Sequence, residues 1–375
     1  MASDRPRLGA LDLLRGITVA GMIVVNNPGN WNSVFPQLTH AAWNGVTAAD
    51  LIFPAFIFIM GVAMSLALGS GRRPGTPAPY WRIVKRAGLL VLLGLVLNTA
   101  SAWPHLDAMR IPGVLQRIGV TYLAAAVITV DTTGTAQLVI AVALLLVHWL
   151  ILVVPFGGVA AGQLEPGRNV AVAIDRWLFG SHVLSPAGDP EGALGVLSSI
   201  ATALLGSTVG RWLRSRSSGS RNQLSGGLMW RLAAAGACGI AFAWAWAALL
   251  PLNKALWTPS FALLTSSVAT LCLVGSMLLD QSPLRDGLAP FLWLGTNPLA
   301  VYFLSELVTD VMQMPWLAGM GHYPAPKDSL FWGVLVPRVG DSGGAWSSLL
   351  YALLYTMVWI GVAGLMRWRG IRIRV

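Results

Sequence analysis

The sequence has few charged residues and almost no cysteine. Only 11% of its 375 residues are Asp, Glu, Lys or Arg, and 55% are hydrophobic. Soluble domains carry roughly 25% charged residues. A soluble fold of this length could not hide so much apolar surface from water, so the composition excludes one. The two cysteines, Cys238 and Cys272, both lie inside apolar runs. They indicate packing residues rather than a disulfide framework or a zinc site.

Apolar runs recur along the whole chain, and most are close to the length that an α-helix needs to cross the hydrocarbon core. Only helices and closed barrels satisfy the backbone in lipid, and runs this long exclude barrel strands. We therefore predict an all-α polytopic integral membrane protein with about ten transmembrane helices in a single domain, residues 1–375. The predicted spans are 11–27, 49–69, 87–103, 113–130, 136–155, 192–213, 228–250, 258–279, 288–308 and 346–366.

Basic residues outnumber acidic ones, 25 against 15, which gives a formal net charge of +10. Most of them fall in alternate connections on one side, so the positive-inside rule predicts cytoplasmic N- and C-termini. Topology and anionic lipid then account for the charge, and no nucleic-acid motif accompanies it. The outer side receives three long connections, 28–48, 156–191 and 309–345, and long connections are often functional.

The first outer connection contains the strongest chemical signal. His40 lies in it, with Asn26 before it and Asp50 after it. A neutral imidazole can take a proton near pH 7, an Asn amide can stabilise an oxyanion, and a carboxylate can hold the imidazole in one tautomer. A plainer interpretation stays open, in which His40 is an exposed loop histidine and Asn26 ends a helix. In that interpretation Asp50 completes a capping box that starts at Thr47.

Two arginines, Arg110 and Arg117, lie seven residues apart and share a face of the predicted fourth helix, in its outer half. A bare charge at this depth is costly, so we expect carboxylate partners. The pattern fits a polar wall around an acceptor site and tunnel, and it fits equally well a structural network of ion pairs. The candidate partners are Asp107, Asp175, Glu191 and Glu306.

Long motifs add to these single residues. The stretch LTHAAWNGVTAADLIFPAFIFIMG is followed in order by RIPGVLQRIGVTYL, IDRWLFGSH, DPEGALGVLSSIATALLG, PLNKALWTPSFALLTSS and GTNPLAVYFLSE. Together with LDLLRGITVAGMIVVNNPG, which precedes them, these motifs resemble the heparan-α-glucosaminide N-acetyltransferase family over residues 8–367. Motifs this long and colinear are far more specific than a short pattern.

The resemblance implies acetyl transfer across a membrane, from cytosolic acetyl-CoA to the amine of a glucosamine-type sugar on the far side. The family's catalytic histidine falls on His40, its partner asparagine on Asn26, with Asn27 as an alternative, and its aspartate on Asp50. No metal is implied. We expect a bacterial-type homologue in the cytoplasmic membrane, without the lumenal N-terminal domain and extra leading helix of the animal enzyme. Its acceptor is then expected to be another amino sugar.

Binding residues are expected from the same resemblance. Candidates for holding the CoA phosphates are Arg72, Arg82, Lys85, Arg86 and Arg211, although the positive-inside rule alone also accounts for them. Candidates for lining the acceptor site or tunnel are Trp43, Asn44, Arg110, Arg117, Asp175 and Glu306. The expected partners are acetyl-CoA, an amino-sugar acceptor and membrane lipid, and a homodimer stays open.

Two other classes of function stay open. A small-molecule transporter fits ten helices with charges at membrane depth, although the paired broken helices common in transporters are not evident in the sequence. A sugar O-acetyltransferase would use the same donor and the same base. The sequence therefore does not separate amine acceptors from hydroxyl acceptors.

Overall fold

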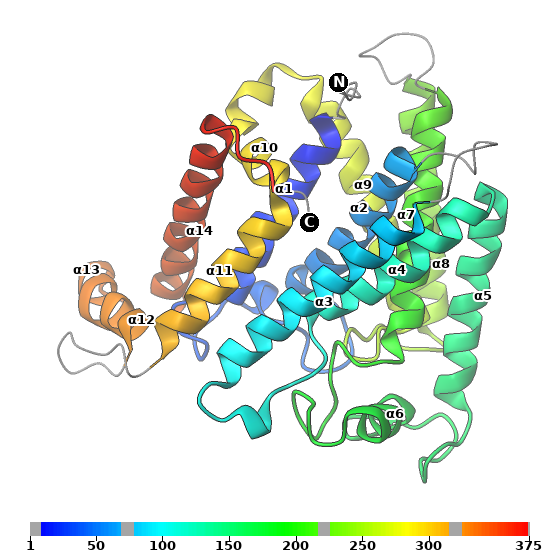
Figure 1. The fold of residues 1–375 in the computed structure, drawn as a ribbon, viewed down its shortest axis with the longest axis horizontal. Helices are drawn as coiled ribbons and strands as arrows, with labels where there is room; N and C mark the ends of the chain where they lie inside the picture. The colour runs from blue at the N-terminus through cyan, green and yellow to red at the C-terminus, as the bar shows by residue number, and fades with distance from the viewer. Residues whose placement is uncertain (1–8, 69–78, 217–225, 315–324, 374–375) are drawn as a thin grey trace. The chain divides into compact units, whose positions relative to one another are not determined.

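The computed structural model of the chain describes residues 9–68, 79–216, 226–314 and 325–373 (Figure 1). Nine helices in these ranges are long and apolar enough to cross a membrane. Each coincides with a predicted span to within a few residues, except that α3 begins at Tyr80. The prediction of an all-α polytopic membrane protein is confirmed. The nine helices are α1 (Gly9–Asn26), α2 (Ala48–Leu68), α3 (Tyr80–Ala102), α4 (Val114–Asp131), α5 (Gly134–Val153), α7 (Gly195–Arg216), α8 (Gly226–Ala247), α9 (Pro259–Asp280) and α14 (Ala345–Trp368).

The predicted span 288–308 is wrong as a single helix. The 3-10 turn η3 (Pro283–Leu288) and α10 (Ala289–Thr296) are followed by α11 (Pro298–Gln313) across a bend of 77°. Pro298 has no N–H to continue a helix, and it disfavours helical backbone at Asn297, whose φ and ψ are −133° and 49°. The Asn297 side chain donates to Ile371 O at 3.0 Å and accepts from Ile373 N at 2.9 Å. The C-terminal segment is therefore bound to the break.

The chain forms two compact units. Unit 1 comprises Met1–His40, Thr47–Ile52 and Gly275–Val375, and unit 2 comprises Ala41–Val46 and Phe53–Val274. The expectation of a single transmembrane domain stays a prediction.

In unit 1, α1 packs against α10, α11 and α14. Gly16 and Gly295 let α1 and α10 approach backbone to backbone. A Cβ at Gly16 would overlap the carbonyl oxygen of Phe291, and a Cβ at Gly295 would overlap that of Asp12. Figure 1 shows that α1 begins and α14 ends at the same end of this unit. This agrees with termini on one side of the membrane, and which side that is stays a prediction.

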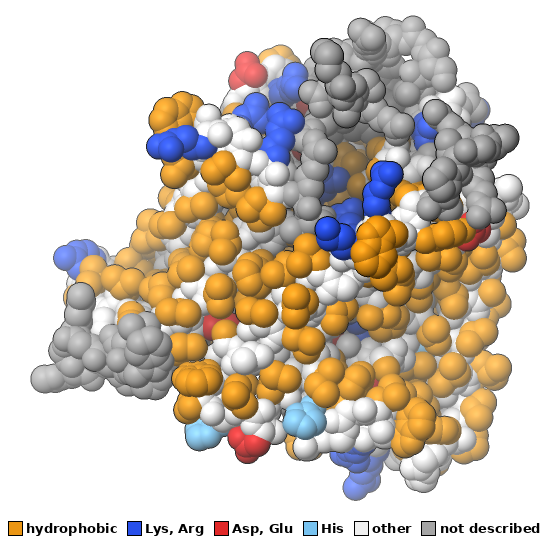
Figure 2. Space-filling view, in the orientation of Figure 1, with side chains coloured by type: hydrophobic (Ala, Val, Ile, Leu, Met, Phe, Trp, Pro, Cys, Tyr) orange, Lys and Arg blue, Asp and Glu red, His pale blue; other side chains and the backbone are white. Residues whose placement is uncertain are grey.

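In unit 2, α3 packs against α4, and α7 packs against both α4 and α5. Large apolar side chains cover the outward faces of several of its helices, and Figure 2 shows them in orange over α3 and α5. In water such surfaces would be unfavourable, whereas in a bilayer they contact lipid chains. Examples are Leu92 in α3, Val139 and Leu150 in α5, and Trp230 and Phe242 in α8.

Short elements organise the long connections. The connection after α1 contains the 3-10 turn η1 (Pro36–Leu38), and the one after α3 contains η2 (Leu106–Ala108). The connection after α5 holds an antiparallel hairpin of β1 (Leu164–Glu165) and β2 (Arg168–Asn169), with Leu164 opposite Asn169, and then α6 (Val170–Phe179). Before α14 come α12 (Pro326–Asp328), the π-helix η5 (Ser329–Leu335) and α13 (Val336–Val339).

Candidate functional site

His40 follows η1 and contacts the first turn of α2. Its Nδ1 lies 2.8 Å from Oδ1 of Asp50. The His40 side chain is 50% exposed, whereas that of Asp50 is 0% exposed. Because an ionised carboxylate only accepts hydrogen bonds, Nδ1 carries the hydrogen in this pair, and Nε2 of the neutral ring carries the lone pair. This orientation suits acid–base or nucleophilic chemistry at Nε2.

Asp50 serves two purposes because it uses its two oxygens separately. While Oδ1 faces His40, Oδ2 accepts the backbone N–H of Thr47 at 3.0 Å, which caps the start of α2. The hydroxyl of Thr47 donates to Thr39 O at 2.6 Å and so ties the residue before His40 to the same turn. The sequence offered the cap and the orienting carboxylate as alternatives, and the geometry is compatible with both.

Asn26 is the last residue of α1, and its amide faces α11. Its Nδ2 donates to Oε1 of Glu306 at 3.2 Å. Asn27, by contrast, is buried and engages both ends of its amide. Its Nδ2 donates to Ile23 O at 2.9 Å, and its Oδ1 accepts from the Thr309 hydroxyl. The hydrogen bonds of Asn27 thus connect the end of α1 to α11. This leaves Asn26 as the better candidate for chemistry.

Trp43 and Asn44 belong to unit 2 and bind other residues of that unit. The indole N–H of Trp43 donates to Leu164 O at 2.9 Å. Asn44 forms an isolated antiparallel bridge with Asn253, whose Nδ2 donates to Asn44 Oδ1 at 3.1 Å. These contacts account for both residues structurally, and a role in lining a tunnel stays a prediction.

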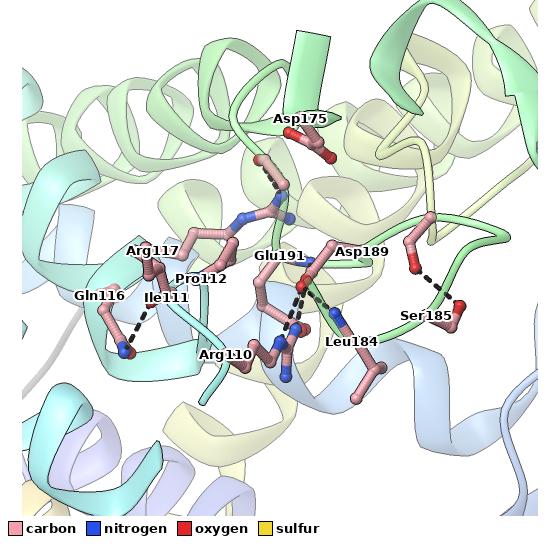
Figure 3. Close-up of polar contacts among 12 residues, drawn as sticks. Arg110, Ile111, Pro112, Gln116, Arg117, Asp175, Leu184, Ser185, Asp189 and Glu191 are labelled. Carbon is pink, nitrogen blue, oxygen red and sulfur yellow. Dashed lines mark hydrogen bonds and ion pairs between the residues drawn. The ribbon is translucent and has the colours of Figure 1, made fainter. Parts of the chain in front are cut away.

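Arg110 precedes α4 and binds two carboxylates (Figure 3). Its Nε donates to Asp189 Oδ2 at 2.7 Å, and its Nη2 donates to Asp189 Oδ1 and to Glu191 Oε2. Burial acts to lower the pKa of Arg110, but the hydrogen bond to Asp189 and the charges of Glu191 and Asp189 outweigh it and raise that pKa. The sequence anticipated Glu191 as a partner and missed Asp189. Glu306, also anticipated here, bonds to Asn26 instead.

Arg117 lies in the first turn of α4 and is only 2% exposed. Its Nη2 donates to Gly192 O at 2.8 Å, and its guanidinium carbon lies 4.7 Å from the ring centroid of Trp257. The expected partner Asp175 instead accepts the backbone N–H of Ala193 on Oδ1 at 2.8 Å. Burial raises the pKa of Asp175 to about 6. The contacts of the two arginines are those of a structural network, and a polar wall around a tunnel stays a prediction.

The candidate phosphate-binding residues of α3 lie in its first two turns. Arg82 and Lys85 are exposed, and the guanidinium carbon of Arg86 lies 4.6 Å from the ring centroid of Tyr122. In Figure 2, Lys and Arg side chains gather toward the end at which α3 begins. Arg72 lies outside the described residues.

Arg211, near the end of α7, has a structural use. Its Nη2 donates to Thr129 O and to Thr132 O, each at 2.9 Å. It thereby satisfies carbonyl groups at the C-terminal end of α4 that have no partner within the helix. Within the described parts of the chain, no group of three His, Cys, Asp or Glu side chains is arranged to hold a metal ion.

Comparison with known proteins identifies the relatives of this chain. A family model described as the catalytic region of heparan-α-glucosaminide N-acetyltransferase matches residues 7–164. The human heparan-α-glucosaminide N-acetyltransferase is 30% identical over 368 residues, which cover 83% of this chain and 54% of the human protein. The mouse protein of that name is 29% identical over 371 residues, which cover 84% of this chain and 55% of the mouse protein.

The chain thus spans about half the length of the curated relatives it matches. The family model ends at residue 164, and the two relatives extend the similarity beyond it. These matches confirm the resemblance that the long motifs indicated. The chain is therefore similar to the heparan-α-glucosaminide N-acetyltransferases of human and mouse over most of its own length.

Proposed function

We propose that this protein transfers the acetyl group of cytosolic acetyl-CoA to the amine of a glucosamine-type sugar on the outer side of a bacterial cytoplasmic membrane. The names of its homologues support N-acetyl transfer. The observation that carries the proposal is the pairing of a half-exposed imidazole, His40, with the fully buried carboxylate of Asp50 at 2.8 Å. Such a pair presents a basic nitrogen whose tautomer and direction are fixed.

In direct transfer, the neutral amine nitrogen attacks the carbonyl carbon of the thioester. Nε2 of His40 takes the proton that this nitrogen loses. The carbon–sulfur bond then breaks, and the CoA thiolate leaves and takes up that proton. The products are the sugar acetamide and the CoA thiol, and the imidazole returns to its starting state.

In a two-step route, Nε2 of His40 itself attacks the thioester carbonyl carbon. The thiolate leaves, and an acetylimidazolium remains whose positive charge the Asp50 carboxylate stabilises. The sugar amine then attacks the acetyl carbon, the bond to Nε2 breaks, and the amine proton passes to the thiolate. Labelled acetyl-CoA added without acceptor distinguishes the routes, because only this one leaves acetyl label on the protein.

Both routes pass through a tetrahedral oxyanion. Asn26 is the proposed donor to that oxygen, because one N–H of its amide is directed at Glu306 and the other has a separate direction. Asn27 is excluded from this role in the proposal because its amide is engaged at both ends.

The donor is proposed to enter with its nucleotide toward the basic end of α3. Acetyl-CoA carries anionic phosphates and cannot cross lipid, so a basic cytoplasmic site would hold it there. Arg82 and Lys85, which are exposed, are the better placed of the candidates. Arg211 already donates hydrogen bonds to the end of α4. It would therefore attract the CoA phosphates by its charge more than by direct contact.

The function is tested with the purified protein in sealed liposomes, labelled acetyl-CoA and a panel of amino sugars. Loss of the thioester that depends on an added amino sugar, with label recovered as an acid-stable amide, supports the proposal. Label recovered as an alkali-labile ester would favour the O-acetyltransferase. Accumulation of unmodified sugar inside the liposomes, with no loss of thioester, would favour the transporter and overturn the proposal.

A further inference from the structure

Arg117 and Asp175 form hydrogen bonds with the two ends of a single peptide group. Arg117 Nη2 donates to the carbonyl oxygen of Gly192, and Asp175 Oδ1 accepts the N–H of Ala193, which belongs to the same peptide bond. Each charge therefore faces the pole of the peptide dipole that it stabilises. Figure 3 shows the two side chains on either side of this turn, next to the pair of Arg110 and Asp189.

Two glycines make this arrangement fit. A Cβ at Gly192 would lie 2.8 Å from Asp175 Oδ1, and a Cβ at Gly195 would lie 2.5 Å from Arg117 Nη2. Neither charged side chain could hold its place beside a larger residue. The turn between α6 and α7 is thus built around the buried guanidinium.

The hydrogen bond to Gly192 uses only one nitrogen of the Arg117 guanidinium, Nη2. Its Nε and Nη1 are buried and have no hydrogen-bond partner among the described residues. The same holds for the indole Nε1 of Trp257, whose ring lies beneath the guanidinium, and for the hydroxyl of Thr121, four residues further along the same face of α4. Buried polar groups without partners are costly, so a cluster of them in one place needs an explanation.

Trp257 adds a second sign of a specialised site. It is 0% exposed and has a φ of 49°, in the left-handed region that bulky residues avoid. Strain of this kind persists where the surroundings over-determine a residue, and it concentrates at ligand-binding sites. Edge-on contacts with Phe53 and Phe261, at 5.3 Å and 5.6 Å between ring centroids, hold the indole in this position.

The charges around the cluster decide what kind of group it would bind. Three carboxylates, those of Glu191, Asp189 and Asp175, act on Arg117, and Arg110 is the one other cation among the causes that act on it. An anionic ligand would add negative charge where carboxylates already outnumber guanidinium groups. Unpartnered N–H and O–H donors in such surroundings suit the oxygen of an uncharged carbonyl.

We propose that Arg117, Trp257 and Thr121 form a buried site for a carbonyl oxygen of an uncharged amide or thioester ligand. The inference rests on the proposed function, which supplies two ligands with this chemistry. One is the pantetheine arm of the donor, with its amides and thioester. The other is the acetamido group of the product.

Calorimetry on the intact protein in detergent separates the sources. The probes are CoA, adenosine 3′,5′-bisphosphate, which is the nucleotide part of CoA without the amide arm, and N-acetylglucosamine. Failure of CoA to bind the unaltered protein would sink the proposed function. If CoA binds, the variants below decide this inference alone.

Trp257→Phe keeps a six-membered aromatic ring and removes the five-membered ring with its N–H, and Thr121→Val keeps the shape and removes one O–H. Because the Thr121 hydroxyl is unpartnered, Thr121→Val should leave the thermal midpoint of the empty protein unchanged or raised. Trp257→Phe also leaves a cavity in the core and should lower that midpoint. The same changes should weaken CoA or N-acetylglucosamine about 3- to 10-fold, with bisphosphate binding unchanged. Trp246→Phe, which removes another buried and unpartnered indole N–H from unit 2, is the matched control and should leave all three affinities unchanged.

The ligand is identified by which probe loses affinity in the variants. Weakening of CoA alone assigns the site to the donor arm, and weakening of N-acetylglucosamine alone assigns it to the product. Unchanged affinities in both variants would mean that the donors hold internal water only, and this would overturn the proposal. Equal weakening of the bisphosphate would overturn it as well, because that probe has no carbonyl group.

Discussion

The two units contain polar sites of opposite design. In unit 1 the reactive nitrogen belongs to a side chain that is half exposed, while its carboxylate partner is completely buried. In unit 2 both Arg117 and its counterpart Asp175 are about 2% exposed, and each binds the main chain of the same turn. A nitrogen that must react with a substrate has to stay accessible, whereas a group that holds backbone in place need not. Exposure combined with rigid support therefore points to chemistry, and complete burial points first to architecture.

The largest effect should come from the exposed member of the unit 1 pair. His40→Ala should lower acetyl transfer by about 10²–10⁴-fold with little change in thermal stability, because the side chain is 50% exposed. Initial rates and melting curves on the same preparation check this. His105→Ala, in the exposed connection after α3, is the control and should retain full activity. A folded His40→Ala protein with near-normal transfer would leave His40 as an ordinary loop histidine.

The next effect should appear in unit 2, and in stability rather than in rate. Arg110→Ala leaves two buried carboxylates, Asp189 and Glu191, without their cation, which typically costs about 3–5 kcal/mol. We expect a markedly lower thermal midpoint and a smaller folded yield. Arg168→Ala, an exposed arginine of the same unit, should change neither. A stable but inactive Arg110→Ala protein would place Arg110 at the acceptor site and remove the contrast between the units.

Asn26→Ala should lower the rate by about 10²–10³-fold, the usual cost of one oxyanion donor, while acetyl-CoA binding persists. Asn27→Ala makes the matched comparison, since the two residues are neighbours with different uses. It removes the bonds to Ile23 and Thr309 and should lower the thermal midpoint, with less effect on the rate of the protein that remains folded. Rate constants normalised to folded protein separate the two, and reversed effects would exchange the two assignments.

The smallest effect concerns pH. Burial raises the pKa of Asp175 to about 6, so the folded state holds its proton more tightly than the unfolded chain does. This stabilising contribution is fully present below about pH 4 and is lost as pH rises to about 6. The Asp175→Asn protein should lack this fall, so its thermal midpoint should decline less than that of the unaltered protein between about pH 4 and pH 6. An unchanged pH dependence would show that the carboxylate is better solvated than its burial implies.

The sequence predicted the membrane helices well because long apolar runs have few alternative structures in lipid. It missed the break at Asn297 because the apolar run continues through it, although Asn-Pro is a recognised signal for an interruption. It named Glu191 for Arg110 but missed Asp189, since a bidentate pair formed across 79 positions leaves no trace in spacing. Asp50 shows a further limit. Spacing could suggest a cap or an orienting carboxylate, but only coordinates show two oxygens with two partners.

The catalytic role of His40 stays a prediction, and so do the binding roles of the basic residues. Long motifs, rather than single residues, indicated the resemblance to the heparan-α-glucosaminide N-acetyltransferases. The hydrogen bonds of Arg117 and Asp175 to one peptide group could not be predicted from the sequence, because their partners are main-chain atoms. Where side chains bind backbone, the pattern of residue types carries little information about the contact.

The packing of α1 has a consequence for the order in which the protein is made. Its partners α10, α11 and α14 lie in the last quarter of the chain, and Asn297 is bonded to Ile371 and Ile373. A ribosome synthesises all of unit 2 before any of these partners exist. Helix α1 must therefore wait in the membrane, unpaired with these neighbours, until they have been synthesised. Unit 2 can assemble during synthesis, whereas the hydrogen bond between Asn26 of α1 and Glu306 of α11 forms only after unit 2 has been made.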